Sequence, residues 1–118
     1  MLEAAAATPD EEVCGLLLGN DGKVETLVPA RNVARDPTRS FEIDPVILLS
    51  AHRTARGQGR HVIGHWHSHP NSRREPSARD AARATENGQI WLIIAGGDML
   101  AWLPHSSGSF RPVAIEVT

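Results

Sequence analysis

Histidines are concentrated in one short stretch of this sequence. Four of the six lie between positions 61 and 69. In an extended chain alternate side chains share a face, so His65, His67 and His69 would point the same way, with neighbours roughly 6.6 Å apart. Two neighbouring imidazoles at that spacing can converge on one metal ion, which each nitrogen binds at about 2.0 to 2.1 Å. A solvated or hydrogen-bonded strand residue remains the alternative for His61 and His65.

A carboxylate follows at Asp80, eleven positions after His69. Ser77 opens an alanine-rich run that is typical of a helix, and Ser77 with Asp80 also matches a capping box, in which Asp80 is the third helical residue. Both interpretations place Asp80 in the first turn, where the helix macrodipole keeps a carboxylate ionised. Two histidines and one carboxylate, with a fourth position open to water, form the ligand set of a catalytic zinc site.

Such a site also needs a base that takes a proton from the metal-bound water. Glu12 is the candidate because it directly precedes the apolar run over residues 13–19, where a less polar environment would raise the pKa of its carboxyl group. Glu11 and Glu12 would also suit a solvated strand edge. Spacing alone does not choose between these two carboxylates.

The elements that must position these residues alternate irregularly between strands and helices. We expect strands over residues 13–19, 23–28, 41–43, 61–67, 89–95, 99–103 and 112–117, and helices over 45–56 and 77–87. Residues 2–7 are typical of the last turns of a helix, and residues 21–22 and 96–98 favour tight turns. This order predicts a mixed sheet flanked by helices, in the α/β (α+β) class.

The composition is that of an ordinary globular protein. Its 118 residues, 41% hydrophobic and 22% charged, predict a single domain over residues 1–118. A net charge of -2 does not favour nucleic acid as a partner. Cys14 is the only cysteine, which excludes an internal disulfide and fits a reducing compartment. The start lacks the basic segment of a signal peptide, and no apolar run reaches the roughly 18 residues of a membrane span, so we expect a cytoplasmic protein without membrane contact.

Three segments together resemble the JAMM (MPN-plus) zinc metalloprotease family, in its compact bacterial form. They are residues 12–19, with a glutamate before an apolar Cys-Gly strand, residues 64–70, with the pattern His-x-His-Pro, and residues 76–80, with Pro-Ser before the helix that carries the aspartate. The resemblance spans nearly the whole chain. It implies zinc ligands at His67, His69 and Asp80, a catalytic base at Glu12, and at Ser77 a catalytic serine that polarises the substrate carbonyl and stabilises the oxyanion.

The resemblance also implies a cytidine-deaminase-like fold and cleavage of peptide or isopeptide bonds after the C-terminal Gly-Gly of ubiquitin-like proteins. Similar compact bacterial enzymes process ubiquitin-fold sulfur carriers, so a sulfur-carrier conjugate is the expected substrate. We expect its tail to add as a strand at a sheet edge beside the site, in a slot narrowed by Gly64 and residues 68–75. Family members place a strand and a fuller helix before the glutamate, whereas eleven residues precede Glu12, so we expect a shortened start or a missing edge element.

Other functions compete with this interpretation. A non-catalytic interaction module of the same fold typically lacks the metal ligands, which are all present here. The deaminase signature requires a Pro-Cys-x-x-Cys that one cysteine cannot supply, and the amidohydrolase His-x-His lies on a barrel of about 250 residues. A small-peptide zinc amidase on the same site remains an alternative because loops decide specificity. The sequence does not predict an oligomeric state.

Overall fold

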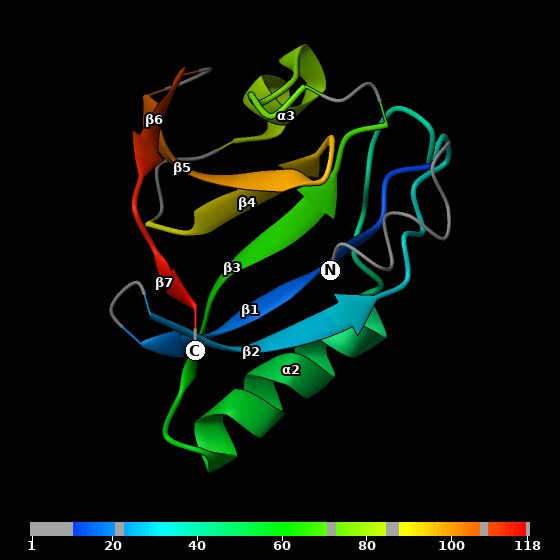
Figure 1. Ribbon diagram of the computed structural model, residues 1–118. Coiled ribbons are helices and arrows are strands. Elements are labelled where there is room, and N and C mark those ends of the chain that lie inside the picture. Colours follow the sequence, from blue (N-terminus) through cyan, green and yellow to red (C-terminus); the bar gives the residue numbers. More distant parts are fainter. Residues whose placement is uncertain (1–10, 21–22, 71–72, 85–87, 107–108, 118) are drawn as a thin grey trace.

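A computed structural model gives the structure of the protein and describes residues 11–20, 23–70, 73–84, 88–106 and 109–117. Figure 1 shows a curved sheet with a long helix against one side and a short helix beyond one end of the central strands. The described strands are β1 (Cys14–Asn20), β2 (Lys23–Ala30), β3 (His61–Ser68), β4 (Ile90–Ala95), β5 (Asp98–Ser106), β6 (Ser109–Val113) and β7 (Glu116–Val117). The described helices are α2 (Pro45–Gly57) and α3 (Ala78–Arg83).

The seven described strands form one sheet in the order β6-β5-β4-β3-β1-β2-β7. Strand β3 runs parallel to β4 and β2 runs parallel to β7, whereas the other neighbours run antiparallel. This arrangement confirms the predicted mixed sheet flanked by helices. Within the described ranges, no helix is long and apolar enough to cross a membrane.

The strand predicted over residues 13–19 is confirmed as β1, and six of its seven residues are buried. It is buried because it lies between β2 and β3 and has apolar groups packed on both faces. Leu17 joins a cluster with Trp66 on one face, while Leu16 and Leu18 pack with α2 on the other. Trp66 is therefore a core residue, as its alternation with the neighbouring histidines predicts.

Strand β3 lies in the middle of the described sheet, so none of the described strands offers the sheet edge expected beside the histidines. The edges of the described sheet are β6 and β7. The expectation that Gly64 narrows a substrate slot is also wrong. Gly64 is buried where β3 passes β4, and a Cβ atom there would collide with the backbone of Ile90. Gly64 therefore allows close packing of two strands.

Helix α2 begins and ends where the sequence predicts. The Asp44 side chain accepts a hydrogen bond from the Val46 N–H at 3.0 Å, and Pro45 takes the first helical position, where its missing N–H costs nothing. Helix α3 is shorter than predicted, since it ends at Arg83, and Ala84 already has extended backbone. The rest of the helix predicted to reach residue 87 lies outside the described residues, as do the helix at 2–7 and the turn at 21–22.

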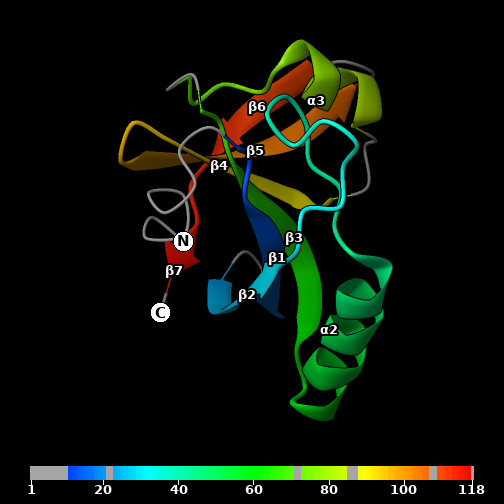
Figure 2. The same ribbon diagram turned by 90° about the vertical axis from the view of Figure 1, so that its right-hand side faces the viewer.

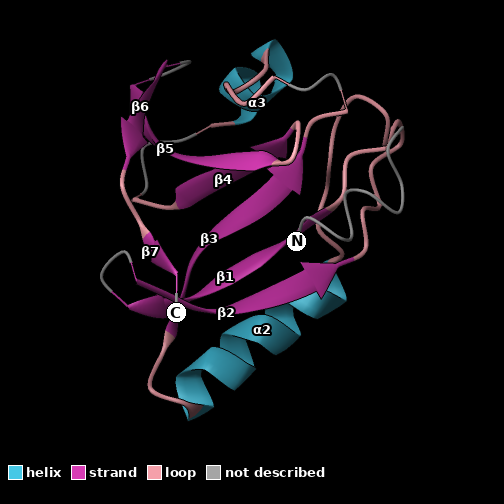
Figure 3. Cartoon of the chain, in the orientation of Figure 1, coloured by secondary structure: helices cyan, strands magenta, loops and turns pink. Residues whose placement is uncertain are grey.

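Two strand predictions are wrong in their extent. The strand predicted over 41–43 is reduced to one bridge between Asn32 and Ile43, within the long loop that joins β2 to α2 (residues 31–44, pink in Figure 3). The strand predicted over 112–117 is split into β6 and β7, which lie at opposite edges of the sheet. Only two residues separate β6 from β7, so the sheet must curl until its edges approach each other.

Candidate metal centre

The three predicted ligand side chains come together just beyond the end of β3. His67 Nε2 lies 3.1 Å from His69 Nε2. Asp80 Oδ2 lies 3.2 Å from His67 Nε2 and 3.0 Å from His69 Nε2. All three side chains are buried. Two imidazole nitrogens and one carboxylate oxygen thus form a nearly equilateral triangle in the interior.

The sheet places the two histidines. His67 pairs with Cys14 of β1 on one side and with Ile93 of β4 on the other, so its backbone is fixed from both directions. His69 follows the strand, and its N–H donates to the Ile94 carbonyl oxygen at 2.8 Å, which continues the β4 ladder by one step. The two imidazoles lie on the same face of this extended segment, as the alternation in the sequence predicts.

The ring of each histidine is held in a definite orientation. His69 Nδ1 lies 2.7 Å from the Arg73 carbonyl oxygen, an acceptor that requires Nδ1 to carry the proton, so the neutral ring presents a lone pair at Nε2. The His67 ring stacks on Phe41, with ring centroids 4.2 Å apart and an interplanar angle of 18°. His67 Nδ1 has no hydrogen-bond partner among the described residues, so this ring is oriented by packing on Phe41 and by the contacts of its Nε2 atom with Asp80 and His69.

The predicted capping box at the start of helix α3 positions the Asp80 carboxylate. Ser77 Oγ accepts a hydrogen bond from the Asp80 N–H at 3.1 Å, and Asp80 Oδ2 accepts one from the Ser77 N–H at 2.9 Å. The capping and ligand interpretations of Asp80 are therefore compatible, because the same oxygen closes the capping box and faces both histidines. The capping interactions fix the carboxylate in the first turn of the helix.

The charges of the cluster follow from burial and from mutual contact. Burial lowers the pKa of His67, which keeps this imidazole neutral. Burial also acts to lower the pKa of His69, but the hydrogen bonds to Asp80 and Arg73 outweigh it and raise this pKa. Burial acts to raise the pKa of Asp80, yet its contacts with the two histidines hold the pKa well below its usual range. Asp80 is thus ionised beside two imidazoles.

This donor set fits a metal ion. Three lone-pair-bearing atoms point at one another at 3.0 to 3.2 Å, and the proton of His69 is turned away toward Arg73. Ligands at about 2.0 to 2.1 Å from a tetrahedral zinc ion are separated by about 3.3 Å, so the triangle has the dimensions of one tetrahedral face. Nitrogen and carboxylate ligands in this number are typical of catalytic zinc centres.

Glu12 is a second carboxyl group beside the same histidines. One oxygen of Glu12 and one nitrogen each of His67 and His69 lie within 4.8 Å of one another. The residue is buried although it precedes β1, and burial raises the pKa of its carboxyl group to about 7. Its Oε1 atom has no hydrogen-bond partner among the described residues. Glu11 is exposed, so the structure separates two carboxylates that spacing alone does not distinguish.

Residues that sequence reasoning missed hold Glu12 in place. The Asn32 side chain donates to the carbonyl oxygens of Glu12 and Ser40 at 2.7 and 3.1 Å, and accepts from two backbone N–H groups of the 31–44 loop. Ser68 Oγ accepts from the Val13 N–H at 2.8 Å, which ties the same segment to the end of β3. The available signal was weak, because an asparagine in a loop and a serine between two histidines are common.

His65 lies on the histidine face but outside the triangle. Its ring contacts Trp91 edge-on and lies beside Phe41, with centroid separations of 4.4 and 5.0 Å. Burial lowers its pKa to about 3, so it is a neutral residue of the aromatic core. His65 Nε2 is buried without a hydrogen-bond partner among the described residues, so His65 is neither the solvated nor the hydrogen-bonded strand residue of the alternative. His61 is exposed and takes no part in the centre.

A cavity of about 310 Å³ opens onto the centre. Its walls come from the segment before β1, the 31–44 loop, the end of β3 and the start of α3, and its lining residues are Glu12, Thr38, Arg39, His69, Pro70, Ser77, Ala78 and Arg79. Glu12 and Ser77 thus face the same space, on which His69 also borders. A bond to be cleaved could reach all three side chains from this cavity.

The fold and the centre together define a class of protein. It is a small α+β domain whose central strand ends at a buried cluster of two histidines and an aspartate, beside a buried glutamate and an open cavity. Such a combination is typical of catalytic metal centres in hydrolases.

Comparison with known proteins identifies the family. Residues 1–105 match the family of prokaryotic homologs of the JAB domain, and the chain belongs to this family, which confirms the resemblance to JAMM proteins. It is 34% identical to a desampylase of Haloferax volcanii over 117 residues, covering 98% of this chain and 84% of that protein. It is also 34% identical to a probable TtuB-protein conjugate cleaving protease of Thermus thermophilus over 88 residues, covering 75% of this chain and 57% of that protein. A solved structure of a protein from Desulfitobacterium hafniense superposes with a TM-score of 0.82 at 31% identity, covering 100% of this chain and 86% of that one.

Proposed function

We propose that this chain is a zinc-dependent isopeptidase, with one domain over residues 1–118, that hydrolyses the bond after the C-terminal Gly-Gly of a ubiquitin-like sulfur-carrier protein in the cytoplasm. The triangle of His67, His69 and Asp80 carries the proposal. The relatives support its coarser form, a hydrolase that acts on protein conjugates, because one of them is named for cleaving TtuB-protein conjugates.

The triangle would hold the zinc ion. When bound there, zinc would supply a Lewis acid that polarises a carbonyl group and lowers the pKa of a water molecule. His67 and His69 would donate through Nε2, and the Arg73 carbonyl would keep the His69 proton on Nδ1. Asp80 would donate through the oxygen that already faces both rings.

The two carboxyl groups would have different roles because their surroundings differ. Asp80 lies at 3.0 to 3.2 Å from both imidazoles and has a lowered pKa, as a permanently ionised ligand should. Glu12 lies farther out and has a pKa near 7, which suits a group that must both accept and release a proton. Glu12 would take a proton from the attacking water and return it to the leaving amine.

Ser77 would stabilise the negative charge that develops on the substrate carbonyl oxygen. Its hydroxyl oxygen already accepts the Asp80 N–H, so its own proton remains available for donation. It borders the same cavity as Glu12. A donor fixed by a capping box before substrate arrives meets the requirement for a preorganised oxyanion site.

The substrate tail would lie in the cavity between the 31–44 loop and the start of α3. Addition of the tail directly to β3 is not favoured, because β3 is paired on both sides in the described sheet. A space of about 310 Å³ is at the small end of ligand sites and suits residues without side chains, such as Gly-Gly.

Mass spectrometry of a defined conjugate tests the proposal. Zinc-loaded protein is incubated with a ubiquitin-fold sulfur carrier whose terminal Gly-Gly is linked to a lysine, with the same conjugate ending in Val-Gly, and with unrelated peptides. We expect cleavage after Gly-Gly, loss of cleavage with a chelator, and a collapse in rate for Val-Gly. Efficient cleavage of the unrelated peptides beside an intact Gly-Gly conjugate would instead indicate a general zinc amidase.

A further inference from the structure

Four exposed arginines lie along the space that leads away from the metal centre. Arg79 and Arg83 stand one turn apart on α3, and Arg35 and Arg39 belong to the 31–44 loop on the opposite wall. We call the space between these walls the arginine groove. It consists of the cavity at the centre and a neighbouring cavity of about 530 Å³, lined by Ala34, Arg35, Ser40, Phe41, Glu42, Arg79, Ala82 and Arg83.

The arginine groove is continuous with the centre. Arg79 lines both cavities, so the two spaces adjoin at this side chain. A molecule that places a bond beside Glu12 and continues toward Arg79 therefore meets the arginines of the larger cavity.

Few carboxylates in the described part of the chain neutralise the groove. Arg39 is 3.8 Å from Asp36, and Glu42 lines the larger cavity, whereas neither Arg35 nor Arg79 forms an ion pair with a described residue. Arg83 donates to the Phe41 carbonyl oxygen and lies over the Phe41 ring, 4.9 Å from its centroid. Arg35 and Arg79 are therefore the arginines of the groove that form neither an ion pair nor a hydrogen bond with a described residue. The groove is a local positive field on a weakly negative molecule.

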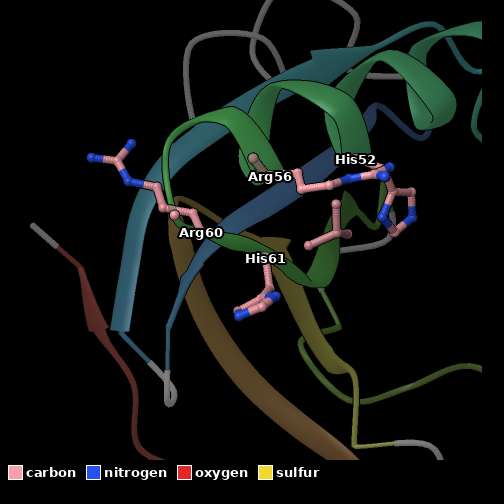
Figure 4. Close-up of a pocket in the computed structure, with 7 residues that line it drawn as sticks. His52, Arg56, Arg60 and His61 are labelled. Carbon is pink, nitrogen blue, oxygen red and sulfur yellow. The ribbon is translucent and has the colours of Figure 1, made fainter.

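A second basic pocket lies at a distance from the arginine groove. The pocket in Figure 4 is lined by His52, Arg56, Arg60 and His61 and lies at the end of α2. Its Arg60 points away from the other three and pairs with Glu25 at 2.8 Å and with Thr26 at 2.7 Å. Figures 1 and 2 place this end of α2 far from α3.

We propose that the arginine groove binds acidic side chains of the ubiquitin-fold carrier, on the residues that directly precede its scissile Gly-Gly. This rests on the proposed function, because it assigns the occupant of the groove from its continuity with the cleavage position. Arginine forks pair with carboxylates in two parallel hydrogen bonds, so the groove selects acidic flanking sequences over neutral or basic ones. The groove thereby adds sequence selectivity to a site whose narrow part accepts only glycine.

Binding of product-like peptides tests this without requiring turnover. Fluorescein-labelled peptides ending in Gly-Gly and preceded by three aspartates, three serines or three lysines are titrated with the protein, and anisotropy is recorded. We expect the aspartate peptide to bind about tenfold more tightly than the serine peptide at low salt, because several exposed ion pairs each contribute modestly. The preference should shrink near 1 M salt, where the screening length falls to about 3 Å.

Charge-reversal variants test whether the arginine groove causes the preference for the aspartate peptide. Arg35→Glu with Arg79→Glu should abolish the preference for aspartate, and a glutamate in the first turn of α3 is compatible with the helix dipole. The matched control is Arg53→Glu with Arg56→Glu on α2, an equal charge change at exposed positions far from the groove. Equal loss in both double variants would reduce the effect to net charge and overturn the proposal.

The remaining outcomes separate this inference from the proposed function. Equal binding of all three peptides with intact cleavage of the Gly-Gly conjugate would overturn the arginine groove and leave the isopeptidase. A retained aspartate preference without any cleavage would leave the groove and overturn the isopeptidase. Stronger displacement of the aspartate peptide by a single-stranded oligonucleotide than by unlabelled peptide would assign the groove to nucleic acid and overturn the proposal.

Discussion

Two buried carboxyl groups face the histidines, and their surroundings shift their pKa values in opposite directions. Asp80 contacts both rings and a backbone N–H, which favours its charge, while Glu12 has an unpartnered oxygen and little to compensate its burial. Environments that push two acids apart in pKa are how an active site assigns different roles to one type of side chain. The residue-scale predictions follow from this division.

Glu12→Gln should keep the fold and the zinc but lower turnover by about a hundredfold or more, because an amide fills the same space without accepting a proton. Turnover of the Gly-Gly conjugate and zinc content are measured together. Glu11→Gln is the control at an exposed neighbour and should have a mild effect. Loss of zinc in Glu12→Gln would make Glu12 a ligand and contradict the assignment.

Ser77→Ala should show two losses of different size. Removal of the cap should cost roughly 0.5 to 2 kcal/mol in the free energy of unfolding. Removal of an oxyanion donor should lower turnover per folded molecule by about a hundredfold or more. Denaturant unfolding and single-turnover kinetics separate the two, with Ser77→Asn as a variant that can retain the cap. Unchanged turnover in Ser77→Ala would reduce Ser77 to a cap.

Cys14 should be inert to thiol reagents in the folded protein. Its side chain is buried in β1, and burial, with the nearby charge of Glu12, raises the thiol pKa to about 12. Since only the thiolate reacts, labelling by Ellman's reagent should require unfolding. The protein in guanidinium is the positive control, and labelling of the folded protein at a comparable rate would show that this strand opens readily.

At the scale of elements, the sequence predicted the helices and strands whose signals lie within a short segment. The apolar run of β1 and the cap and proline of α2 are visible within a short stretch of sequence, which is why both elements could be predicted. The length of α3 and the pairing of residues 112–117 were missed because they depend on distant partners. The same holds for Asn32, whose role arises only from hydrogen bonds to a segment twenty positions away.

Gly64→Ala tests the close contact between β3 and β4. A methyl group there would meet the Ile90 backbone, so the strands must separate, and we expect a loss of roughly 1 to 3 kcal/mol in unfolding free energy. Gly57→Ala is the matched control, because nothing lies within 4 Å of its Cβ position and alanine favours the helix. Equal stabilities of the two variants in a urea titration would contradict this packing.

At the scale of the whole molecule, the centre depends on segments far apart in the sequence. Glu12 comes from the segment before β1 and Phe41 from the 31–44 loop. The histidines come from β3 and the residue that follows it, and Asp80 comes from α3. Three of these were expected from the sequence because their residue types carry chemistry. The contribution of Phe41 was not, because nothing in the sequence distinguishes an apolar residue that stacks on a histidine from any other core residue.

The zinc content of the purified protein tests the central claim most directly. Metal is analysed in wild-type protein and in Asp80→Ala, each after dialysis against metal-free buffer. This compares the complete set of three ligands with a set that lacks the carboxylate. The structure predicts about one zinc ion per chain in the wild type and loss of most of it in Asp80→Ala. An absence of zinc from reconstituted wild type, or stoichiometric zinc in both proteins, would contradict a metal centre formed by His67, His69 and Asp80.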